Sequence, residues 1–160
     1  MFHKSRSILF LLFVLASHTC ALATSRFSFP ETGKFVLSPA TGPQLFKQCS
    51  RGAPEGVVDF WQPSAAEINE LERLLINNLD AREKRGASIP PNGTYNRQYI
   101  GFTKNRVRYI YGNYYRSGSP YVSNEKFMPQ MICDGGPDFW GIVFRVDKKK
   151  FDAPSFNGSI

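Results

Sequence analysis

The sequence predicts an α+β domain in which one long helix packs on a curled antiparallel sheet of four to five strands, stapled by one disulfide. Helical spacing of apolar residues from Ser64 to Arg85 predicts the helix. Aromatic and β-branched runs at 95–102 and 107–115 predict a strand pair. A second strand pair is predicted after residue 138. Runs of helix and strands that follow one another in this way are typical of α+β folds.

The first 23 residues have the features of a secretory signal peptide. Lys4 and Arg6 precede an apolar run, Ile8 to Ala16, that is too short to span a bilayer. Ala21-Leu22-Ala23 fits a small-x-small cleavage site. We therefore expect residues 24–160 to form a single exported α+β domain, periplasmic or secreted, with no transmembrane helix.

Removal of this leader would leave a chain without histidine, because both histidines precede residue 24. It would also lower the formal net charge from +7 to +5, since Lys4 and Arg6 are lost. The absence of histidine excludes Ser-His-Asp and Cys-His nucleophiles, histidine-ligated zinc and imidazole bases. We expect no enzymatic activity, no cofactor and no metal site.

Two cysteines, Cys49 and Cys133, remain after cleavage, in a compartment that oxidises thiols. They are far apart in sequence, and neither lies in a Cys-x-x-Cys motif, which disfavours a redox-active pair. We expect them to form one structural disulfide.

The helix should begin at Ser64, because Ser64 and Glu67 have the spacing of a capping box and Pro63 precedes them. Acidic residues lie near its start and basic residues near its end, which complements the helix dipole. Gly86 can adopt the left-handed conformation that ends a helix. Its apolar stripe is expected to face the core and consists of Ile68, Leu71, Leu75 and Leu79.

Before the helix, residues 24–56 are interrupted by proline and glycine and predict loops with one or two short strands. In the first hairpin we expect the Val107, Tyr109 and Tyr111 face to pack on the helix. The opposite face, with Arg106 and Arg108, would then carry cations, to which Arg97 could add. Residues 116–128 predict a long surface loop, and 139–146 with 151–156 a second hairpin across Asp147-Lys148-Lys149-Lys150.

The run from Cys133 to Gly141 places two carboxylates around a Gly-Gly-Pro turn. In a binding site, Asp134 and Asp138 would take a cation or a basic group of a partner, and Gly135 and Gly136 would allow close backbone approach. A tight turn before a strand would explain the same residues. The sequence leaves both interpretations open, and neither aspartate belongs to an EF-hand pattern.

Tyrosines and cations gather after the first hairpin, and Tyr114, Tyr115, Arg116 and Tyr121 have the composition of protein-binding surfaces. Continuation of the aromatic core would explain the tyrosines equally well. Export disfavours nucleic acid as the partner, so an envelope protein or an anionic glycan is expected. The lysines at 148–150 are explained by solvated charge at a hairpin tip.

Four blocks resemble small exported bacterial proteins of uncharacterised function. They are Gln48-Cys49-Ser50-Arg51, Phe60-Trp61-Gln62-Pro63-Ser64, Arg97-Gln98-Tyr99-Ile100-Gly101 and Cys133-Asp134-Gly135-Gly136 through Gly141. The resemblance spans residues 45–158 and implies an envelope location. It assigns no activity to any residue. In outline the predicted fold is similar to cystatin-like and NTF2-like domains.

The leading hypothesis is an exported non-catalytic binding protein, such as an inhibitor or immunity-type protein that caps a cell-envelope hydrolase. The residues expected to make contact are Tyr114, Tyr115, Arg116, Tyr121, Asp134, Gly135, Gly136 and Asp138. Two alternatives remain open. One is a binder of a small apolar or anionic ligand in the concavity of the sheet. The other is a carboxylate-dependent enzyme acting on a glycan, with Asp134, Asp138 or Asp59 as its acid and base.

Overall fold

The computed structural model describes residues 26–158, so the predicted leader and its cleavage site lie outside the described residues. The strands in chain order are β1 (Phe27–Ser28), β2 (Lys34–Val36), β3 (Asp59–Trp61), β4 (Gly93–Lys104), β5 (Val107–Arg116), β6 (Phe139–Arg145), β7 (Lys150–Phe151) and β8 (Ser155–Phe156). The helices are α1 (Gly42–Leu45) and α2 (Ala65–Lys84), and the 3-10 turns are η1 (Glu31–Gly33), η2 (Pro39–Thr41) and η3 (Gly136–Asp138).

The sheet is built around β4, β5 and β6, which are antiparallel neighbours in this order. Beyond β4 lie β1 and β2, both parallel to it, and the antiparallel β3. Beyond β6 lie β7 and β8. An α+β fold with a mostly antiparallel sheet is therefore confirmed, as is the first predicted hairpin. The second is confirmed in part, because the predicted strand over 151–156 is two separate short strands, β7 and β8. The predicted strand count was too low, because the sheet has eight strands and those at its edges are only two or three residues long.

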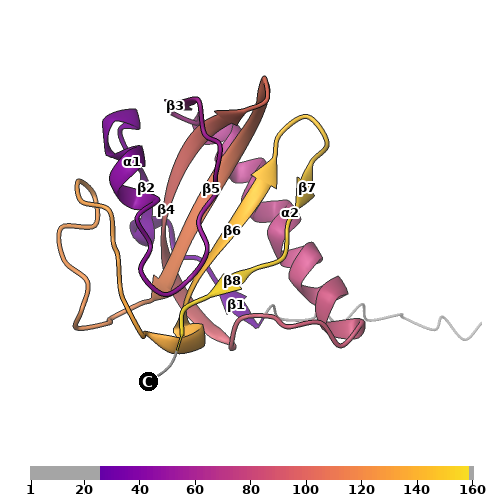
Figure 1. Cartoon of the computed structure of the whole chain (residues 1–160). Coiled ribbons are helices and arrows are strands. Elements are labelled where there is room, and N and C mark those ends of the chain that lie inside the picture. The colour runs from indigo at the N-terminus through magenta and orange to yellow at the C-terminus, as the bar shows by residue number, and fades with distance from the viewer. Residues whose placement is uncertain (1–25, 159–160) are drawn as a thin grey trace, which may run out of the picture.

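Helix α2 lies diagonally across one face of this sheet (Figure 1). It forms as predicted: the Ser64 hydroxyl accepts a hydrogen bond from the Glu67 backbone N–H, and the Glu67 carboxylate accepts one from the Ser64 backbone N–H. The helix ends before Gly86, which has a φ of +69°. The helix spans 20 residues, and α1 is a second, short helix that the sequence analysis did not predict.

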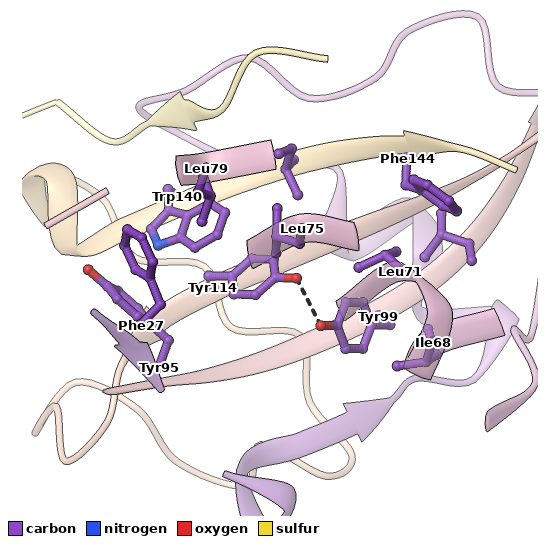
Figure 2. Packing of buried hydrophobic residues seen from close by; sticks show 12 residues of the cluster. Phe27, Ile68, Leu71, Leu75, Leu79, Tyr95, Tyr99, Tyr114, Trp140 and Phe144 are labelled. Carbon is purple, nitrogen blue, oxygen red and sulfur yellow. Dashed lines mark hydrogen bonds between the residues drawn. The ribbon is translucent and has the colours of Figure 1, made fainter. Parts of the chain in front are cut away.

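The main core lies between α2 and the sheet, where large aromatic rings from the central strands meet the leucines of the helix (Figure 2). The rings of Tyr114 and Trp140 stack with centroids 3.9 Å apart. The Tyr99 and Tyr114 hydroxyls are hydrogen-bonded to each other at 2.8 Å. Burying such rings removes large apolar areas from water, which is the main stabilising contribution of this face.

A second core lies on the opposite face of the sheet, under α1 and the segment that precedes it (Figure 1). Its fully buried members are Leu37, Leu45, Ile100, Phe102 and Tyr111. Tyr109 packs against this second core, so the predicted orientation of β5 was wrong. Ile110 and Tyr114 face α2 instead. Both faces of the central strands are buried, so the alternation of residue types could not identify the side on which the helix packs.

Candidate functional site

Residues 117–135 form a loop on the side of the sheet away from α2 (Figure 1, orange). Gln98 of β4, which is fully buried, fastens the middle of this loop. Its amide nitrogen donates to the carbonyl oxygens of Glu125 and Met128 at 2.6 and 2.7 Å, and its amide oxygen accepts from the Gln130 backbone N–H at 2.8 Å. The loop therefore has fixed attachments despite its lack of regular structure.

Further buried polar side chains extend this attachment. Asn113 of β5 donates to the Gln130 carbonyl at 2.9 Å and accepts a hydrogen bond from Arg51. Arg51 also donates to Asn157, which in turn donates to the Ile132 carbonyl. A loop that is buried against a sheet must find partners for its backbone polar groups, and these side chains supply them.

The end of the loop is held by the disulfide between Cys49 and Cys133, which confirms the predicted pairing. The Asp134 backbone N–H donates to the Ser50 hydroxyl at 3.3 Å, next to the disulfide. The Gly136 backbone N–H donates to the Gly158 carbonyl at 2.9 Å. The turn at 134–138 is thus joined to two segments that are distant in sequence.

Two adjoining surface hollows lie between this turn and the first part of the loop, with volumes of about 510 and 440 Å³. They share Tyr121, Asp134 and Gly135. The larger hollow is otherwise lined by Met131, Ile132 and Cys133, and the smaller by Arg116, residues 117–120, Asp138 and Phe139. Both are open to solvent, and Tyr121, whose side chain is 73% exposed, stands between them.

An ion pair between Arg116 and Asp138 forms one wall of the smaller hollow. The Arg116 Nε lies 3.1 Å from the Asp138 Oδ1, and the Arg116 Nη1 donates to the Asn92 carbonyl at 2.8 Å. The guanidinium also lies over the Tyr95 ring, 5.0 Å from its centroid. The hydrogen bond to Asp138 raises the pKa of Arg116 above its ordinary value, so the arginine stays charged.

The structure brings together most of the site residues that the sequence suggested. Arg116, Tyr121, Asp134, Gly135 and Asp138 all line the two hollows. Gly136 begins the short turn η3 beside them and is buried, with a φ of +61°.

Tyr114 and Tyr115 do not belong to this surface, and the expectation that they lie in an exposed loop was wrong. Both are in β5 and are 0% and 1% exposed. Tyr114 packs on Trp140 under α2, and Tyr115 lies on the opposite face of the sheet. Burial raises the pKa of both hydroxyls far above the ordinary value, so they stay neutral. They are core residues, which was the other interpretation of this segment.

The cations of the first hairpin do not form one exposed face. Arg97 is fully buried under α2 and pairs with Glu72 at 2.8 Å. Arg108 lies 3.7 Å from the centroid of the Trp61 ring and pairs with Glu67 at 3.1 Å. Arg97 follows Tyr95 and precedes Tyr99 at two-residue spacing, a sequence signal that it shares a face with these two tyrosines.

The sequence analysis missed the buried amides of Gln98, Asn113 and Gln130. Asparagine and glutamine inside strands are unusual, and Gln98 and Asn113 interrupt otherwise aromatic runs, which is a signal that could have identified them. Asp59, the third carboxylate considered for catalysis, is paired with Thr103. Thr103 lies eight positions after Tyr95, which pairs with Arg116, so about 27 Å of strand separates Asp59 from the end of the sheet where Arg116 lines the smaller hollow.

Within residues 26–158, no cluster of three or more acidic, cysteine or histidine side chains could hold a metal ion. No helix in this part of the chain has the length and apolar character needed to cross a membrane. Comparison of the chain with protein-family models, with curated proteins and with solved structures finds no match. The function must therefore be argued from the hollows themselves.

Proposed function

We propose that this chain is an exported, non-catalytic binding protein that docks on a partner protein through the two hollows and the loop beside them. The observation that carries the proposal is Tyr121, a largely exposed aromatic side chain on a loop that is fastened by fully or nearly buried amides. Exposed aromatics on rigid supports lose little conformational entropy on binding, which favours them as contact residues. Phe127, Met128 and Met131 add exposed apolar area to the same loop.

Export is supported by the basic and apolar pattern of the leader and is consistent with the disulfide between Cys49 and Cys133. A periplasmic or secreted location makes an envelope protein the expected partner. Within that class we favour a hydrolase, whose activity the binding protein would block as an inhibitor or immunity-type protein.

The experiment is capture of envelope proteins with the purified, oxidised protein, followed by assay of any captured hydrolase. We expect one hydrolase to bind at a defined stoichiometry and to lose activity. Tyr121→Ala should weaken capture at least tenfold, a typical loss for an aromatic contact residue. Val58→Ala is the matched control, because Val58 is 79% exposed but lies outside the loop. Equal capture by both variants, or a bound hydrolase that keeps its activity, would contradict the proposal.

A carboxylate-dependent enzyme remains a second candidate, because Asp134 and Asp138 line the same hollow. Asp138 is engaged in an ion pair with Arg116, so its carboxylate is less free than that of Asp134 to contact a substrate. Hydrolysis of an envelope glycan that is lost in both Asp134→Asn and Asp138→Asn would favour this candidate over binding.

The third candidate, a binder of a small ligand, was expected to use the concavity of the sheet. The hollows are a better location for such a ligand than the faces of the sheet, since core side chains fill both of those faces.

A further inference from the structure

Asp134 has a different environment from the other carboxylate of the hollows. Asp138 is neutralised by Arg116, whereas no ion pair within residues 26–158 involves Asp134. The larger hollow around Asp134 is lined mainly by apolar groups, among them the Tyr121 ring and the Met131 side chain. Asp134 is exposed, so water reaches its charge, but the apolar wall on one side of it reduces the screening compared with a wholly polar surface.

The main chain that carries this carboxylate is held in a defined place. Asp134 has a φ of +58°, in the left-handed region that glycine adopts without strain and aspartate only at some cost. Its neighbour Cys133 is fixed by the disulfide, and its own N–H is bound by the Ser50 hydroxyl. Because the backbone is already fixed, binding at this carboxylate has to order only its side chain.

We infer that the larger hollow accepts an arginine side chain of the partner protein, with the guanidinium on Asp134 and the methylene stem against Tyr121 and Met131. This inference rests on the proposed function. Arginine suits the hollow because its planar head pairs with a carboxylate and stacks on an aromatic ring, while its stem covers apolar surface.

The local charge agrees with this choice of ligand. The charged residues that line the two hollows are Asp134, Asp138 and Arg116, which leaves one net negative charge. The whole chain, by contrast, carries a formal net charge of +7, or +5 without the predicted leader. A basic group of a partner is therefore attracted to the hollow and repelled by the net positive charge of the whole chain. This difference favours binding of the basic group at the hollow over other positions on the protein.

The first test uses Nα-acetyl-arginine N-methylamide as the probe and its citrulline analogue as the neutral control of equal shape. Amide NMR of the labelled protein should show saturable shifts at Tyr121 and residues 131–135 with the arginine probe. Binding of the citrulline probe, or of the arginine probe to Asp134→Asn, should be about fivefold weaker. Asparagine tolerates the same backbone conformation, so this variant should fold. Asp59→Asn is the control variant, since this exposed carboxylate lies at the other end of β4.

Equal binding of the two probes, or shifts confined to other parts of the protein, would overturn the inference. A second measurement separates it from the proposed function. If a hydrolase is captured and inhibited but Asp134→Asn captures it as well as the original protein does, the arginine inference is wrong and the proposed function stands. If the arginine probe binds at Asp134 while no hydrolase is captured, the preference for a guanidinium stands and the proposed partner class is wrong.

Discussion

The two faces of β4 and β5 are covered by different kinds of structure, α2 on one and the irregular loop at 117–135 on the other. Alternate residues of the same two strands contact each of them. Toward α2, Tyr99 and Tyr114 are fully buried among leucines, and the helix satisfies its own backbone. Toward the loop, Gln98 and Asn113 are as deeply buried but point amides at backbone carbonyls. A helix needs only an apolar surface beneath it, whereas an irregular loop needs donors and acceptors as well. Both faces contain a buried core, and the difference is that the face away from α2 must also fasten the irregular loop that presents the hollows.

The largest expected effect is on the loop face, from removal of the disulfide by Cys49→Ala together with Cys133→Ala. Since the two cysteines are 84 residues apart, the chain-entropy argument gives a loss of about 4 kcal/mol in the free energy of unfolding. Urea denaturation measures it. Hydrogen exchange should accelerate most in residues 130–136, and uniform acceleration across α2 and the loop would contradict the division between the faces.

On the helix face, Leu75→Ala should lower the free energy of unfolding by about 3 kcal/mol, because it leaves a cavity among fully buried side chains. Asn77→Ala, on the exposed side of the same helix, should change it by less than about 0.5 kcal/mol. Under conditions in which it is fully folded, Leu75→Ala should keep the affinity of the original protein for the arginine probe. If fully folded Leu75→Ala lost affinity for the probe, packing on the α2 face would be coupled to binding at the hollows.

Gln98→Ala tests the polar attachment of the loop. It leaves the Glu125 carbonyl without its donor and the Gln130 backbone N–H without its acceptor, at a cost of about 2 kcal/mol. The Met128 carbonyl keeps a hydrogen bond from the Gln130 side chain. Amides at 124–130 should exchange faster while those of α2 keep their relative protection. Gln62→Ala, at an exposed position before α2, is the matched control. It should leave the free energy of unfolding and the exchange rates of the loop amides unchanged. Slower exchange in the loop or an unchanged stability would show that Gln98 does not fasten it.

The smallest effect is expected at the start of α2, where Glu67 completes the cap. Burial raises the pKa of Glu67, but hydrogen bonds from Ser64 and the Arg108 ion pair outweigh it, so the net pKa lies below the ordinary value. A lowered pKa stabilises the fold above the unfolded pKa, and this contribution is lost as pH falls through the folded pKa. The stability difference between the original protein and Glu67→Gln should be at most about 1 kcal/mol at pH 7 and should shrink below pH about 4. Denaturation curves at both pH values measure it, and a difference that does not depend on pH would contradict this role.

Sequence patterns predicted the parts of the fold that depend on neighbouring residues. The capping box of Ser64 and Glu67, the helix end at Gly86 and the turn between β4 and β5 are all local signals, and all are confirmed. One or two short strands were predicted within residues 24–56, where β1 and β2 lie, but their partner was not predicted, and β3 was not predicted at all. Each is two or three residues long and forms only by pairing with β4, which lies far along the chain.

The candidate site was predictable in part. The turn from Asp134 to Asp138 was identified because glycine, proline and aspartate favour tight turns. Tyr121 was identified because the residues around it have the composition of a surface loop. Tyr114 and Tyr115 were misplaced because composition does not report burial. That Arg116 would pair with Asp138 could not be foreseen, since it depends on β5 and β6 being neighbours in the sheet.

The short outer strands also affect how the protein behaves in concentrated solution. Along β4, residues 93–94, 97–99 and 101–103 are covered in turn by β1, β2 and β3. Along β6, residues 140–141 and 144–145 are covered by β8 and β7. Unpaired edges of long strands are templates for pairing with another molecule, and the two longest edges in the described chain are closed in this way. The covering strands are each two or three residues long, so none of them offers a long edge for a second copy to extend.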